Sequence, residues 1–209
     1  LRSDGALSEF SRQHLVRLLK EGLAFTVASA RAVSSVRAAL PDLPLSLPII
    51  AGNGAVLADL RTGQRVAAHT LDAPLLRSLY AFVGERGHVP FLAALDGADE
   101  RLFYSRLANE GMERYVALKQ SKQDRRLCPV SDLADCLGQP IIAVALCDRR
   151  AALEDLAAAV EWDRDAALAA VAAVNPDATV VETSARTGAG IDDLLDLLST
   201  RTPHLQEAP

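Results

Sequence analysis

The chain has 209 residues, of which half are apolar and 23% are charged, a composition typical of a globular protein with one full domain or two small ones. Its formal net charge of −5 and the lack of an evident basic face argue against a nucleic-acid or anionic-membrane partner. No apolar run reaches the ~18 residues of a membrane span. The spacings of Cys128, Cys136 and Cys147 fit neither a disulfide framework nor a zinc site. We therefore expect a cytoplasmic protein without a bound structural metal, whose oligomeric state the sequence leaves open.

The first part of the chain alternates predicted helices and strands. A helix is expected from Ser8 or Ser11 to Gly22, and the apolar run 23–28 is expected to be a strand buried on both faces. A second helix over 31–40 stops at Pro41, and a second buried strand covers 47–51. This alternation with short links is typical of a doubly wound parallel α/β sheet.

After this point the predicted elements resemble those of an α+β domain. Strands at 55–59 and 64–69 flank Arg61-Thr62-Gly63, a hairpin pattern with glycine at the turn. The remaining predicted elements are a helix at 73–87, strands at 89–94, 101–104 and 140–146, and a helix at 149–160. The stretch 107–138 is polar and poorly periodic, so no regular element is predicted there. We place a domain boundary near 55–60, which gives domains of residues 1–57 and 58–160.

The last part of the chain forms a third predicted segment, residues 161–203. It consists of a helix at 165–174, a strand at 178–182, a polar loop at 183–190 and an amphipathic helix at 191–198. The arrangement is that of a strand–loop–helix unit.

The first candidate site follows the first buried strand, at Ser29 and Arg31. In an open parallel α/β sheet, ligands bind beyond the carboxyl ends of the strands. A hydroxyl at this place can donate to a phosphate oxygen, and Arg31 can add charge-assisted hydrogen bonds. The alternative is that Ser29 only caps the following helix.

The second candidate site is the segment Gly52-Asn53-Gly54, at the end of the next strand. Two glycines let the backbone approach a ligand closely, and an Asn side chain can both donate and accept hydrogen bonds. A tight turn with a left-handed Asn53 is the alternative interpretation.

In order and spacing, these segments resemble the start of a haloacid-dehalogenase-type phosphatase of the Cof-like group. In that group a helix leads into a strand ending in a Thr/Ser-x-x-Arg type segment, and a second strand ends in Asn-Gly-Ala. Here the segments read Phe25-Thr26-Val27-Ala28-Ser29-Ala30-Arg31 and Ile49-Ile50-Ala51-Gly52-Asn53-Gly54-Ala55, with Ala30 where the family usually has glycine. The stretches 104–112 and 141–160 resemble the family's cap, so the resemblance spans residues 1–160.

The resemblance implies an α/β fold, with a partial doubly wound parallel sheet and an α+β cap domain. It also implies a phosphomonoesterase that acts on a small phosphorylated metabolite such as a sugar phosphate. Ser29 matches the hydroxyl that holds the transferring phosphoryl group, with Arg31 assisting. Asn53, between Gly52 and Gly54, matches a residue lining the substrate pocket. Mg²⁺ is the cofactor expected for the family.

The family's nucleophile motif, Asp-x-Asp-Gly-Thr, is missing from the sequence, as are the later Lys and the Gly-Asp-x-x-Asn-Asp segment that binds Mg²⁺. Asp4-Gly5 does not replace the motif, because Arg2 would then stand at the nucleophile position. We expect an N-terminally truncated chain, preceded in the gene by that motif, which is inactive as it stands. A non-catalytic binding protein built on the same fold is the alternative.

The segment 174–191 resembles the C-terminal part of the nickel-enzyme (hydrogenase) maturation GTPases. In those proteins a Ser-Ala-Lys/Arg-Thr-Gly loop contacts guanine, so Ser184 and Ala185 would be the nucleotide-binding pair. No P-loop GxxxxGK[ST] motif occurs in the sequence. A strand–loop–helix that only completes an α/β layer is the other interpretation, and a GTPase-related protein for metal-centre assembly is a further alternative function.

Overall fold

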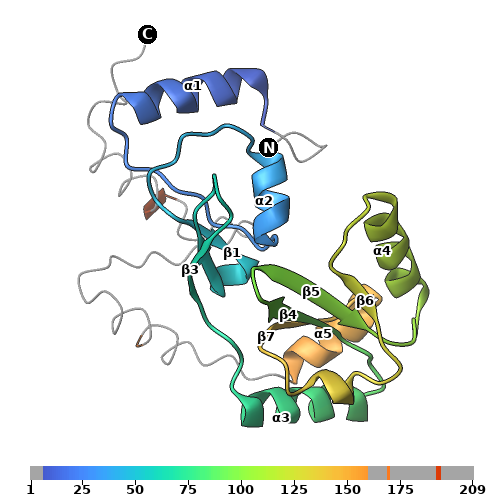
Figure 1. Ribbon diagram of the computed structural model, residues 1–209. Coiled ribbons are helices and arrows are strands. Elements are labelled where there is room, and N and C mark those ends of the chain that lie inside the picture. The colour runs from blue at the N-terminus through green and yellow to red at the C-terminus, as the bar shows by residue number, and fades with distance from the viewer. Residues whose placement is uncertain (1–6, 160–168, 170–191, 194–209) are drawn as a thin grey trace. The chain divides into compact units, whose positions relative to one another are not determined.

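The computed structural model describes residues 7–159, 169, 192 and 193, and the chain divides into two compact units, residues 1–157 and 158–209. The helices and strands labelled in Figure 1 lie between residues 9 and 158. The predicted third segment, 161–203, therefore lies outside the described residues apart from 169, 192 and 193.

The first sheet has three short antiparallel strands. They are β1 (Ile49–Ala51), β2 (Val56–Ala58) and β3 (Arg65–Ala68), in the order β1-β2-β3. A 3₁₀ turn, Gly52–Gly54, joins β1 to β2. The hairpin predicted around Gly63 is confirmed as the β2–β3 pair.

The strand predicted at 23–28 is wrong, because only Ala28 forms a bridge there. That bridge pairs Ala28 with Ile50 in parallel, which is the direction expected of an α/β unit. Pro48 has no N–H group to extend the ladder, and its carbonyl oxygen accepts a hydrogen bond from Thr26 Oγ1 at 2.6 Å. The segment before Ala28 therefore runs beside β1 without forming a strand of its own.

Two helices accompany this sheet: α1 (Glu9–Lys20), capped by Ser8, and α2 (Val33–Ala39). The helix predicted at 31–40 is thus confirmed but shorter, because its N-cap is Ala32. One buried apolar cluster holds α2 to the sheet, with α1 packed against it. Its buried members from α2 and the sheet are Val33, Val36, Ile49, Ala51, Val56 and Ala58.

The second sheet has the strand order β6-β5-β4-β7. Its strands are β4 (Phe91–Asp96), β5 (Asp99–Tyr104), β6 (Leu127–Pro129) and β7 (Ile141–Ala145). The β4–β5 and β4–β7 pairs are antiparallel, and β5–β6 is parallel. Mixed pairing of this kind, with helices alternating between strands, confirms the predicted α/β class.

Helices cover both faces of the second sheet. Leu76 of α3 (Ala73–Glu85) packs with Leu92, whereas Met112 of α4 (Glu110–Ser121) packs with Phe91. Because successive residues of a strand point to opposite faces, α3 and α4 lie on opposite sides of β4. Helix α5 (Arg150–Ala158) follows β7 (Figure 1).

The expectation that 107–138 lacks regular elements is wrong, since this stretch contains α4, β6 and a 3₁₀ turn at Ala134–Cys136. Asn109 begins α4, and its Oδ1 accepts a hydrogen bond from the Met112 amide at 2.9 Å. Its Nδ2 donates to the Cys147 carbonyl at 3.0 Å, which ties the start of α4 to the segment that follows β7. Side-chain capping of this kind compensates for the weak apolar stripe of the helix.

The two sheets share apolar contacts. Ile142 of β7 belongs to the buried cluster of the first sheet, and Ala93 and Leu95 of β4 pack against it. The boundary predicted near 55–60 falls within β2, in the middle of the first sheet. The division into domains of residues 1–57 and 58–160 stays a prediction.

None of the helices in the part of the chain described here has the length and apolar character needed to cross a membrane.

Substituting Gly63 by Ala should destabilise the protein by roughly 1–2 kcal/mol, because Gly63 has a φ of +76° that a side chain disfavours. The new Cβ would also lie 2.7 Å from Nη1 of Arg37, whose guanidinium is held by the carbonyls of Leu60 and Arg61. Urea unfolding measures the change. Gly84→Ala, in the helix α3 with open space around it, is the control and should instead be neutral or stabilising. Equal stability of Gly63→Ala and the unmodified protein would contradict this account.

Candidate functional site

The structure brings the two sequence-predicted loops together. The Asn53 amide donates to the Ser29 carbonyl oxygen at 3.3 Å, and the Gly52 amide donates to the Arg31 carbonyl oxygen at 2.9 Å. The Ser29 amide in turn donates to the Ile50 carbonyl oxygen at 2.8 Å. The two loops therefore lie side by side at the carboxyl end of the paired segments, where α/β sheets bind ligands.

The Ser29 hydroxyl belongs to a local turn. Its oxygen accepts a hydrogen bond from the Arg31 amide at 3.2 Å, and the residue is half-buried. The helix that follows begins at Val33 after Ala32, which has no side chain that could cap it. The alternative in which Ser29 serves as the N-cap of α2 is therefore wrong. The hydroxyl hydrogen remains able to donate to another group.

The second loop has an unusual backbone. Gly52, Asn53 and Gly54 have φ values of 56°, 57° and 94°, so the interpretation as a tight turn with a left-handed Asn53 is confirmed. The turn leaves Asn53 exposed, and its side-chain amide makes no hydrogen bond with any residue that the structure describes. The geometry is thus compatible with a contact from this amide to a ligand.

An apolar cavity of about 200 Å³ adjoins the first loop. Ser29 and Arg31 are its polar lining residues, and the others are apolar. Leu7, Leu15, Phe25, Val27, Val36, Ala39, Leu40 and Leu43 make up that apolar lining. A hydroxyl and a guanidinium at the edge of an apolar space can hold a polar group at its entrance.

Sequence reasoning missed Glu100, which lies beside the first loop. Its Oε1 accepts a hydrogen bond from the Val33 amide at 3.2 Å, so a carboxylate from β5 takes up an N–H at the start of α2. Its Oε2 lies 3.5 Å from Nη1 of Arg126, which also pairs with Asp124 at 2.6 Å. Lys119 lies 3.4 Å from the same Asp124 carboxylate. No local sequence signal indicates this contact, because 67 residues separate the partners.

The Glu100–Arg126–Asp124 network is largely shielded from solvent. The three side chains expose 11%, 17% and 13% of their surface, so their charges interact more strongly than those of a surface ion pair. A second contact reinforces the position of the β4–β5 hairpin, since Arg65 of β3 donates to the Asp99 carbonyl oxygen at 3.1 Å. The hairpin is therefore fixed against both α2 and the first sheet.

No group of three metal-ligating side chains occurs among residues 7–159, 169, 192 and 193. Such a group for the Mg²⁺ expected of the family is therefore not among these residues. Ser184 and Ala185, the predicted nucleotide-binding pair, lie outside the described residues.

A family model described as haloacid dehalogenase-like hydrolase matches residues 1–185. A comparison with curated proteins found no match. A phosphatase of the haloalkanoate (HAD) enzyme superfamily from Bacteroides thetaiotaomicron is similar in structure, with 19% identity, a TM-score of 0.55, and coverage of 76% of this chain and 57% of its own.

Two other solved structures are similar over more of the chain. A haloacid dehalogenase-like hydrolase from B. subtilis has 14% identity and a TM-score of 0.53 over 97% of this chain and 75% of its own. A protein from Thermotoga maritima has 16% identity and a TM-score of 0.53 over 98% and 72%. At such identities the likeness shows the fold alone. The chain spans less than two thirds of the length of the Bacteroides structure.

Replacing Asp124 by Asn should remove an acid-sensitive part of the stability. The hydrogen bonds from Arg126, with the charges of Arg126 and Lys119, lower the pKa of Asp124 from 3.8 to about 2. A carboxyl whose pKa is lower in the folded state stabilises the protein above its unfolded pKa, and that contribution is lost as the pH falls through the folded pKa. The stability difference between the unmodified protein and Asp124→Asn should therefore be constant above about pH 5 and shrink between pH 4 and pH 2.

Urea unfolding at several pH values tests this expectation. Asp155→Asn, at an exposed position of α5, is the matched control, and its effect on stability should not follow the same profile. A difference for Asp124→Asn that stays unchanged down to pH 2 would show that the ion pair with Arg126 does not depress this pKa.

Proposed function

Because the chain belongs to the haloacid dehalogenase-like hydrolases, we propose that it is the substrate-side part of a phosphomonoesterase for a small phosphorylated metabolite. The family acts on phosphorylated substrates, and the phosphatase from Bacteroides thetaiotaomicron shares the fold. The substrate class and the roles of single residues are part of the proposal.

The observation that carries the proposal is the pair of backbone hydrogen bonds between the two loops, from Asn53 to Ser29 and from Gly52 to Arg31. These bonds join the backbones of two loops whose side chains include a hydroxyl, a guanidinium and an amide. Each of these groups can donate hydrogen bonds to the oxygens of a phosphate ester.

In the proposed site, Ser29 donates its hydroxyl hydrogen to a phosphoryl oxygen while its oxygen continues to accept from the Arg31 amide. Arg31 adds positive charge at the rim of the apolar cavity. Asn53 contacts the substrate, with Gly52 and Gly54 allowing the left-handed backbone of this turn. Positive φ at all three positions makes glycine the residue of choice on either side.

Hydrolysis needs two further groups: a carboxylate nucleophile and Mg²⁺, which this family typically uses. The sequence contains no Asp-x-Asp-Gly-Thr motif, and no group of three metal-ligating side chains occurs among the described residues. We therefore propose that the chain as given binds a phosphate group without turning over the ester. Within this proposal its residues position the phosphate, and they carry out no bond-breaking step.

Replacing Ser29 by Ala should weaken binding of glucose 6-phosphate about ten- to a hundredfold, because a hydrogen bond to a charged oxygen contributes roughly 1.5–3 kcal/mol. Isothermal titration calorimetry of the whole chain measures this change. Ser29→Thr keeps the hydroxyl and should restore most of the affinity. Ser78→Ala, at an exposed position of α3, is the matched control and should bind as the unmodified protein does.

Two results would count against the proposal. Unchanged affinity of Ser29→Ala would remove Ser29 from the phosphate contact. Magnesium-dependent release of p-nitrophenol from p-nitrophenyl phosphate by this chain would show that a nucleophile is present after all. No hydrolysis together with tight binding of the sugar phosphate is the expected combination.

A further inference from the structure

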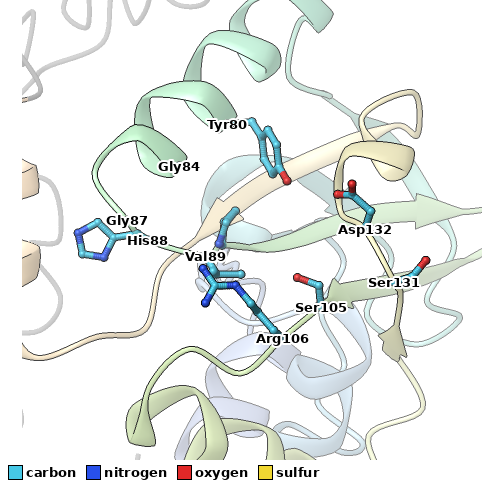
Figure 2. Close-up of a pocket in the computed structure, with 10 residues that line it drawn as sticks. Tyr80, Gly84, Gly87, His88, Val89, Ser105, Arg106, Ser131 and Asp132 are labelled. Carbon is cyan, nitrogen blue, oxygen red and sulfur yellow. The ribbon is translucent and has the colours of Figure 1, made fainter.

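A second cavity, of about 320 Å³, lies in the part of the chain that contains the second sheet. It is bordered by the end of α3, the start of β4, and the residues that follow β5 and β6 (Figure 2). Its polar lining side chains include Tyr80, Ser105, Arg106, Ser131 and Asp132. A cavity of this size is at the lower end of the range for small-molecule sites, so it suits a small polar metabolite.

The cavity contains one cation and one anion that do not pair with each other. Arg106 makes no hydrogen bond or ion pair with the residues that the structure describes. Asp132 accepts one hydrogen bond, from the Ala134 amide to its Oδ1 at 2.8 Å, and its carboxylate can accept more. In Figure 2 the Ser105 side chain lies between the two charged groups.

Neutral hydroxyls complete the lining. Figure 2 shows the Tyr80 hydroxyl and the Asp132 carboxylate turned toward the same space. Burial, helped by the charge of Asp132, raises the pKa of Tyr80, so the phenol stays neutral and can donate a hydrogen bond. His88 does not compete for this space, because its ring points away and pairs with Asp148 at 3.0 Å.

Most of the length of β5 lies between this cavity and the part of the chain that contacts α2. Ser105 follows the end of β5, whereas Glu100, which contacts Val33 of α2, lies near the start of the same strand. A strand advances about 3.3 Å per residue, so five residues correspond to about 16 Å. A ligand bound at Ser105 therefore does not depend on the phosphate-binding groups proposed above.

We infer that this cavity binds a small zwitterion of the amino-acid class, whose carboxylate pairs with Arg106 and whose ammonium group pairs with Asp132. A purely anionic ligand would be repelled by Asp132, and a purely cationic ligand would be repelled by Arg106. A neutral ligand would leave both charges without a counter-charge. Ser105 and Tyr80 supply hydrogen bonds to the polar atoms between the two charged ends.

Calorimetric titration of the whole chain with glycine, β-alanine and γ-aminobutyrate tests the inference, since these zwitterions differ in the separation of their charges. At least one should bind at millimolar concentration, whereas acetate and methylammonium, which each carry only one of the charges, should not. Arg106→Gln and Asp132→Asn should each weaken the binding about tenfold or more, because each removes a charge-assisted contact. The Asn side chain can keep the hydrogen bond from the Ala134 amide, so the fold is preserved.

Arg125→Gln and Asp135→Asn are matched controls, because both residues are exposed and lie outside the cavity lining. Both should bind the zwitterion as the unmodified protein does. The inference is overturned if none of the three zwitterions binds, if acetate alone binds as tightly as they do, or if the control variants lose the same affinity. Circular dichroism of each variant shows whether a loss of binding comes from unfolding.

Discussion

The hydrogen bonds from the Gly52 and Asn53 amides to the carbonyl oxygens of Arg31 and Ser29 are the interactions on which the proposed site depends. They join two loops that follow different paired segments, and the short parallel pairing of Ala28 with Ile50 brings those loops to the same edge. Without them, the hydroxyl of Ser29 and the amide of Asn53 would belong to separate surface turns. Backbone hydrogen bonds therefore set how the two loops lie relative to each other.

A left-handed backbone makes these bonds possible. Asn53, which is not glycine, has a φ of 57°, a conformation that costs free energy for most residues but is tolerated best by Asn. Glu100 accepts a hydrogen bond from the Val33 amide at the start of α2, and Arg126, which also pairs with Asp124, pairs with Glu100. The left-handed turn thus shapes the second loop, and the shielded charge network supports the start of α2, which follows the first loop.

Much of this arrangement could be predicted from the sequence. Apolar periodicity and glycine turns indicated the helices, the hairpin at Gly63 and the two loops after the paired segments, because these features depend on local residue patterns. The apolar periodicity did not indicate α4, because the start of this helix depends on the Asn109 side chain rather than on an apolar stripe. The apolar run also predicted a full strand before Ala28, but Pro48 has no N–H group with which this segment could extend its pairing with β1. The contact of Glu100 with Val33 is long-range and leaves no trace in local sequence.

The most direct test of the account is a titration with inorganic phosphate followed by amide signals in ¹H–¹⁵N spectra of the whole chain. If the two loops form one phosphate-facing surface, the signals of Ser29, Arg31, Gly52 and Asn53 should shift together and saturate with a single dissociation constant. Shifts confined to one loop, or different dissociation constants for the two loops, would contradict the account.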